Sequence, residues 1–120
     1  MGAIRSFQDL EVWQRAHQLV LDVYQVTQGF PIEEEHGLMS QMRQAAVSVP
    51  VNIVEGFKRR AKSEKIRFYS ASEASSEKLK YLLILSRDLG YITDIDQLAA
   101  DAETVSRMLS GLVQSAKSRR

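Results

Sequence analysis

Residues 93–117 read TDIDQLAADAETVSRMLSGLVQSAK. Apolar side chains recur in this stretch every three or four positions, which places them on one face of an α-helix. We expect a helix over residues 94–117, with Thr93 and Asp96 forming a capping box at its start. An apolar face of this length needs other helices to pack against. Its members are Leu98, Ala102, Val105, Leu109, Leu112 and Ala116.

Three further segments repeat this period. Four helices joined by short connections predict an all-α fold, an antiparallel up-down-up-down four-helix bundle. The length of 120 residues fits one domain, so we expect a single domain over residues 1–120. The expected helices cover residues 10–28, 33–58, 63–89 and 94–117.

Glycine, proline and serine set the expected helix ends. Gly29 and Pro31 should end the first helix, because glycine caps a C-terminus and proline cannot continue the ladder. Ser63 is the expected N-cap of the third helix, and Gly90 should stop it. Pro50 lies inside the second segment, where the apolar period continues across it. We therefore expect one helix kinked at Pro50 rather than two helices.

The apolar period also predicts which faces of the middle helices are buried. On each helix we expect one stripe to form the core. The stripe is Leu38, Met42, Ala45, Val49 and Ile53 in the second helix, and Phe68, Ala71, Ser75, Leu79, Leu82, Leu85 and Leu89 in the third.

Apolar residues extend beyond one face on the first two helices. A helix that is apolar on two faces is either central in its fold or shared with another subunit, so we expect a homo-oligomer. In the first helix one line consists of Leu10, Trp13, Ala16 or His17, Val20 and Tyr24, and the line beside it of Val12, Leu19 and Val26. In the second helix, Val47, Val51 and Val54 lie off the main stripe.

Composition excludes several classes of protein. With 44% hydrophobic and 26% charged residues, the chain is too apolar to be disordered. It contains no cysteine, which excludes disulfides, thiolate metal sites and cysteine nucleophiles and favours a cytoplasmic location. No apolar run approaches the roughly 20 residues that span a bilayer, so we expect no membrane partner.

The residues that carry chemistry do not form a catalytic pattern. His17 and His36 lack the Glu-x-x-His spacing of di-iron bundles, so we expect no metal site. Glu73 and Glu77 are one turn apart, but glutamates in such positions are usually solvated or paired with a cation. No nucleophile–base pair and no glycine-rich phosphate loop occurs. We therefore expect neither an enzyme nor a cofactor.

Positive charge is concentrated in one stretch. Residues 58–67 contain six basic residues and one acidic residue, although the whole chain has a net charge of +1. Such a density suits phosphate groups, and Phe57, Phe68 and Tyr69 beside it suit stacking on exposed bases. The alternative is a solvated helix connection, paired with the carboxylates of residues 33–35 in the same or a neighbouring subunit. The candidate nucleic-acid-binding residues are Lys58, Arg59, Arg60, Lys62, Lys65 and Arg67, with Arg43 as a weaker candidate.

Two stretches of the sequence resemble a known family. They are Phe7 to Gln14, which reads FQDLEVWQ, and Gln41 to Gly56, which reads QMRQAAVSVPVNIVEG. On these residues the chain resembles the bacterial four-helix-bundle proteins encoded by intervening sequences within ribosomal RNA genes. The second stretch has Gln44 where the family often has a second arginine, which removes one positive charge from that surface.

The resemblance implies a cytoplasmic bacterial protein that assembles as a homopentamer. It also implies kinship with the accessory variability protein of diversity-generating retroelements, a similar pentamer with a basic surface. That protein works with a reverse transcriptase and nucleic acid. We therefore expect a non-enzymatic, oligomeric protein associated with nucleic acid, RNA before DNA. The alternative is a structural or protein-interaction scaffold whose basic stretch is only solvated.

Overall fold

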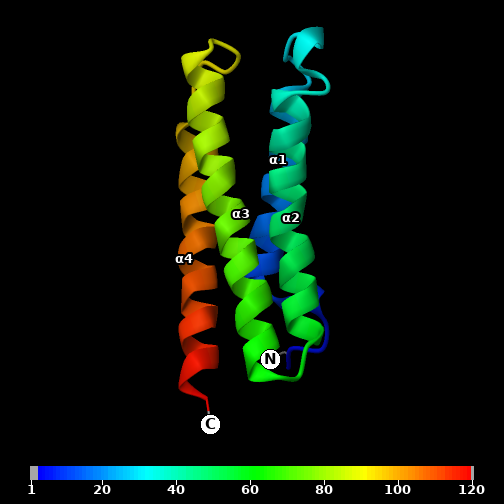
Figure 1. The fold of residues 1–120 in the computed structure, drawn as a ribbon, viewed down its shortest axis with the longest axis vertical. Coiled ribbons are helices and arrows are strands. Elements are labelled where there is room, and N and C mark those ends of the chain that lie inside the picture. The colour runs from blue at the N-terminus through cyan, green and yellow to red at the C-terminus, as the bar shows by residue number, and fades with distance from the viewer. Residues whose placement is uncertain (1–2, 120) are drawn as a thin grey trace.

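The computed structural model describes residues 3–119, which form four long helices and two short 3-10 turns (Figure 1). No β-strand occurs in this part of the chain. The elements are η1 (Phe7–Asp9), α1 (Glu11–Thr27), η2 (Ile32–Glu34), α2 (Leu38–Lys58), α3 (Lys62–Asp88) and α4 (Asp96–Ser118).

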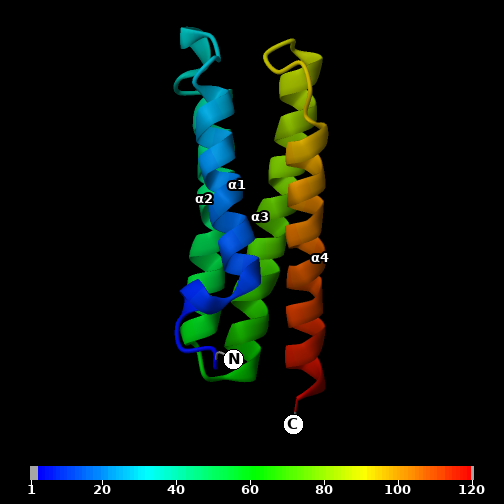
Figure 2. The same cartoon turned by 180° about the vertical axis from the view of Figure 1, so that it is seen from behind.

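The helices form the predicted antiparallel bundle. Each contacts its two neighbours in the cyclic order α1–α2–α3–α4–α1. Figure 2 shows both termini and the α2–α3 connection at one end of the bundle, and the α1–α2 and α3–α4 connections at the other. The predicted all-α, up-down-up-down fold is confirmed.

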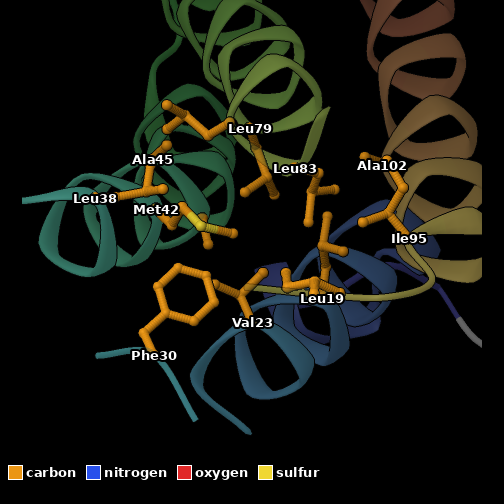
Figure 3. Close-up of a cluster of buried hydrophobic side chains, with 13 residues drawn as sticks. Leu19, Val23, Phe30, Leu38, Met42, Ala45, Leu79, Leu83, Ile95 and Ala102 are labelled. Atoms are coloured by element: carbon orange, nitrogen blue, oxygen red, sulfur yellow. The ribbon is translucent and has the colours of Figure 1, made fainter. Parts of the chain in front are cut away.

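The core consists of two apolar clusters, one above the other along the bundle. The cluster near the α1–α2 and α3–α4 connections gathers side chains from all four helices, and Phe30 and Ile95 close it from the connections (Figure 3). The cluster nearer the termini joins α1, α2 and α4 through Val12, Ile53 and Leu109. The predicted stripe of the second helix is buried along its whole length. Its burial ties α2 to both clusters.

The buried face of α1 takes residues from both apolar lines. Its buried residues are Val12, Ala16, Leu19, Val23 and Thr27, while Val26 of the second line is half-buried. Trp13 and Val20 are half-buried and Tyr24 is 40% exposed. Because both lines are apolar, periodicity alone does not separate the face in the core from the face outside it.

The expected stripe of α3 is right only at Leu79 and Leu82; Leu85 is half-buried and Leu89 is 50% exposed. The first half of the helix is rotated by one position from the stripe. The bundle buries Tyr69, Ser72 and Ser76 instead of Phe68, Ala71 and Ser75. The two serine hydroxyls donate to backbone carbonyls of the neighbouring helices, Ser72 to Val49 at 2.7 Å and Ser76 to Ala102 at 2.9 Å. Small side chains satisfied in this way let helices approach closely, which hydropathy does not reveal.

Three expected helix starts are wrong. The segment 33–37 is not α-helical: it contains the end of η2 and a turn. The helix α2 begins at Leu38, whose N–H donates to the Glu34 carboxylate at 3.0 Å. Ala61 precedes α3 in place of the expected Ser63 cap. Thr93 and Asp96 form no capping box, because α4 begins only at Asp96. Its first N–H instead donates to the side chain of Asp94 at 2.9 Å. Local carboxylates thus accept the first N–H groups of α2 and α4, whereas α3 begins without a side-chain cap.

The stop at Gly90 is confirmed. This residue has φ of +84°, and it is the only described residue in the left-handed region. The Gly90 N–H donates to the Arg87 carbonyl and the Tyr91 N–H to the Ser86 carbonyl, both at 2.9 Å. These two bonds are the Schellman arrangement, which satisfies the last carbonyls of the helix.

Other expected breaks behave differently. Gly29 lies two residues beyond α1, which ends at Thr27, and has no left-handed φ. Pro50 lies inside an unbroken α2, so the prediction of one helix rather than two is confirmed. The kink itself stays a prediction. We expect it at Pro50, because proline has no N–H to donate to the carbonyl of Ala46.

The interface of α3 and α4 carries an ion network that predicts acid sensitivity. Lys80 donates to Glu103 and to Glu77, and Arg107 donates to Glu103 at 3.2 Å. The hydrogen bond from Lys80, followed by that from Arg107, lowers the pKa of Glu103 below its ordinary value of 4.5. A lowered folded-state pKa contributes stability above pH 4.5 and loses it as the pH falls through the folded value.

Chemical denaturation at neutral and acid pH tests this network. Native protein should lose more unfolding free energy on acidification than Glu103→Gln, which has no charge to lose. Asp101→Asn is the control, because Asp101 accepts only from the neutral Gln97 amide. Identical pH profiles for native protein and Glu103→Gln would contradict the assignment.

Candidate nucleic-acid interface

The basic segment, residues 58–67, lies at the end of the bundle that holds the termini. It comprises the last residue of α2, the extended connection at residues 59–61 and the first turns of α3. The Lys62 ammonium donates to the Arg119 backbone carbonyl at 2.7 Å, 57 residues away in sequence. This contact joins the C-terminal basic residues Lys117 and Arg119 to the segment. We call these two groups together the basic end.

Two arginines of the segment are engaged with carboxylates. Arg59 donates to Glu55 at 2.8 Å, approaches Glu64 at 3.9 Å and lies over the Phe68 ring. Arg67 lies over the same ring, 4.4 Å from its centroid, and pairs with Glu64 at 3.3 Å. Phe68 is therefore covered by guanidinium groups of the same chain. Both guanidinium groups are thus paired with carboxylates of the same chain.

Lys65 is turned toward the protein. Its ammonium donates to the carbonyls of Gly56 and Phe57, at 3.0 and 3.1 Å, near the C-terminal end of α2. A cation in this position satisfies unpaired carbonyls and interacts favourably with the helix dipole. Burial, followed by the nearby charge of Arg119, lowers the pKa of Lys65. Two N–H groups of the ammonium donate to helix carbonyls, and the third has no acceptor among the described residues.

The other three predicted cations face solvent. Lys58, Arg60 and Lys62 are exposed, and none has a carboxylate partner within residues 3–119. The same holds for Lys117 and Arg119 at the end of α4. The basic end therefore presents five uncompensated cations. The sequence identified three of these in the segment but did not predict that the tail joins them.

Arg43 lies apart from the basic end. It is 15 residues before Lys58 on α2, a separation of about 22 Å along the helix axis. Its guanidinium donates to the Thr27 hydroxyl at 2.9 Å and to the Tyr24 carbonyl at 3.2 Å, and it lies over the Tyr24 ring. The structure thus gives Arg43 a role in fastening the end of α1 to α2.

Six of the 15 acidic residues lie at the opposite end. The carboxylates of residues 33–35 lie before α2, whose 21 residues extend about 30 Å to the basic segment. Pairing between these groups in the same chain is therefore excluded. Asp88, Asp94 and Asp96 flank the α3–α4 connection at this same end. The bundle has one basic end and one acidic end.

The outer surface of α1 and α2 carries exposed apolar side chains among polar ones such as Arg43 and Gln44. Tyr24 is 40% and Val51 49% exposed, and with Val47 they line an open groove of about 610 Å³. Trp13 stacks on His17 farther along α1, with ring centroids 5.0 Å apart. We call this surface the outer α1/α2 face. It contains the first-helix line that the core leaves partly uncovered.

The part of the chain that the structure describes contains neither a group of metal-ligating side chains nor a membrane-spanning helix. Within residues 3–119, no three His, Asp or Glu side chains are grouped closely enough to hold a metal ion. No helix in that range is long and apolar enough to cross a bilayer. His36 lies 3.4 Å from the Glu35 carboxylate, and His17 lies against Trp13.

Comparison with family models gives one match. The model described as 23S rRNA-intervening sequence protein matches residues 8–111. The chain belongs to the 23S rRNA-intervening sequence protein family. For this family member the matched range begins in η1 and ends within α4, so it includes the whole basic segment but stops before Lys117. No curated protein matches the chain.

Proposed function

We propose that this protein is a non-enzymatic RNA-binding protein that holds phosphates with the basic end. The observation that carries the proposal is the group of five exposed cations without carboxylate partners among the described residues. They lie at the α2–α3 connection and at the end of α4, and Lys62 joins these two places through its contact with Arg119. A surface that pairs with carboxylates would be screened; this one is free to exchange its counterions for phosphates. The acidic opposite end would repel the same polyanion.

The arrangement favours binding driven by charge and shape. Lysine and arginine contacts to phosphate position a nucleic acid without reading its sequence. Each phosphate neutralised on a single strand adds about 0.7 to the slope of log affinity against log salt. Five cations would therefore give a slope of up to about −3.5. We propose that this binding takes place in the cytoplasm, in keeping with a chain that contains no cysteine.

A charge-matched pair of double variants tests the proposal. Lys58→Gln with Arg60→Gln removes two free cations from the basic end, whereas Lys78→Gln with Arg87→Gln removes the same charge from elsewhere on α3. Affinity for a structured RNA should fall in the first variant and the salt slope should become shallower by about 1.4. The second variant should behave as native protein in fluorescence anisotropy titrations from 50 to 200 mM salt.

Two results would contradict the proposal. One is the absence of RNA binding by native protein at 50 mM salt. The other is an equal loss in both double variants, which would mean that only net charge matters. A protein partner that survives nuclease treatment in a pull-down, together with absent RNA binding, would favour the scaffold alternative.

We further propose that the outer α1/α2 face is buried between copies of the chain. The exposed Tyr24 and Val51 and the half-buried Val47 form an apolar surface of the kind that soluble proteins cover by association. The resemblance to pentameric relatives favours a ring of five. A sedimentation mass of one 13.6 kDa chain would overturn this part of the proposal.

A further inference from the structure

A small pocket opens at the basic end, between the end of α2, the start of α3 and the end of α4. Its volume is about 210 Å³. Leu10, Phe57 and Leu112 give it apolar walls, and Lys65, Tyr69 and Arg119 contribute polar groups. We call it the end pocket. Arg119, one of the five free cations, lines it, and Lys62 contacts the backbone carbonyl of Arg119.

Three hydrogen-bond donors converge on the end pocket. The Lys65 ammonium donates to two carbonyls and has a third N–H to spare. Neither the Arg119 guanidinium nor the Tyr69 hydroxyl donates to another side chain or carbonyl within residues 3–119. Burial raises the pKa of Tyr69 while the charge of Arg119 opposes that effect, which fits a guanidinium close to the phenol. The pocket therefore offers donors.

The shape and chemistry of the end pocket limit what it accepts. It is smaller than the roughly 300–1,000 Å³ of pockets for drug-sized ligands, which suits one flat ring system. Apolar walls do not suit a bare phosphate, which is held by charge and polar groups alone. No carboxylate and no Asn or Gln amide lines the pocket. A ligand edge that carries an amino group would thus lack a side-chain carboxylate or amide acceptor there.

Among the bases of RNA, guanine meets these conditions. Its N7 and O6 atoms are both acceptors, and arginine and lysine are their commonest specific partners. The 2-amino group of guanine lies on its opposite edge, whereas adenine and cytosine present an amino group on the corresponding edge, which calls for Asn, Gln or a carboxylate. Uracil presents O4 alone on that edge, without a second acceptor beside it. An unpaired base is needed, because a duplex does not release a ring into a pocket. We infer that the end pocket binds an unpaired guanine while the surrounding cations hold its flanking phosphates.

This inference rests on the proposed function and is tested separately from it. The probes are labelled single-stranded RNA octamers of adenosine with one central position changed to G, C or U. Native protein should bind the G octamer about tenfold more tightly than the A octamer in anisotropy titrations. Arg119→Gln should abolish this preference. Lys117→Gln loses the same charge outside the pocket and should keep it.

A steric variant gives a second readout. Ser115 is exposed and lines the pocket mouth, so Ser115→Trp should fill the pocket without entering the core. Gln114→Trp is the matched control, one residue outside the lining. Ser115→Trp should bind all four octamers equally. Equal affinity of native protein for all four, with a normal salt slope, would overturn the guanine pocket and leave the proposed function standing. Absence of binding to any RNA would overturn both.

Discussion

Replacing Gly56 with valine is expected to lower the free energy of unfolding by about 3 kcal/mol, because it overfills the closest approach between α2 and α3. A Cβ atom at Gly56 would lie 2.6 Å from Cε1 and 2.8 Å from Cδ1 of the Tyr69 ring. The ring has little room to retreat, since Tyr69 is only 6% exposed. Urea denaturation followed by far-ultraviolet circular dichroism measures the change.

Gly111 provides an internal control of opposite sign. It also lies inside a helix, α4, but a Cβ atom there meets nothing within 4 Å. Gly111→Ala should raise the unfolding free energy by about 1 kcal/mol, the difference in helix propensity between the two residues. A Gly56→Val protein as stable as native protein would show that the helices separate at little cost, contrary to the packing described.

Placing two glutamates on the outer α1/α2 face, Val47→Glu with Val51→Glu, is expected to convert the proposed oligomer into single chains. Val51 is 49% exposed in the isolated bundle, so the change should spare the fold of each chain. If the face is an interface, each variant chain would lose roughly 1.5–3 kcal/mol of association free energy per fully buried valine. Association would also bury two unpaired carboxylates, which is costly. Analytical ultracentrifugation measures the mass.

Tyr81 supplies the control for this variant. It is 59% exposed on the outer side of α3, away from the outer α1/α2 face. Tyr81→Glu should leave the mass of the native assembly unchanged. An unchanged mass for the valine double variant would exclude the outer α1/α2 face as the interface.

The sequence predicted the helices better than their ends. Stripes with a clear contrast between apolar and polar positions, as at Met42 and Leu109, identified buried residues correctly. Prediction failed where burial depends on a hydrogen bond, as for Ser72, whose hydroxyl donates to a carbonyl across the helix interface. It failed again at the start of α2, where the Glu34 side chain from a 3-10 turn replaces a conventional cap.

The candidate site was predicted as one group of charges. The structure separates cations that pair with carboxylates or carbonyls of the same chain from cations that have no carboxylate partner among the described residues. Sequence spacing alone could have predicted the two ion pairs. Glu55 is four residues before Arg59, and Glu64 is three before Arg67, which are the separations of paired charges on a helix. The contact between Lys62 and Arg119 joins residues 57 positions apart and follows only from the lengths of α3 and α4. The end pocket depends on that same meeting.

The separation of acidic and basic residues along the bundle has a consequence for encounters in solution. Opposite charges held about 30 Å apart on a rigid rod form a permanent electric dipole. The electric field of an approaching polyanion would exert a torque on this dipole and rotate the protein before contact. Most collisions would then begin with the basic end facing the polyanion. Added salt would then slow association more than it hastens release, because screening shortens the range over which the rod is aligned.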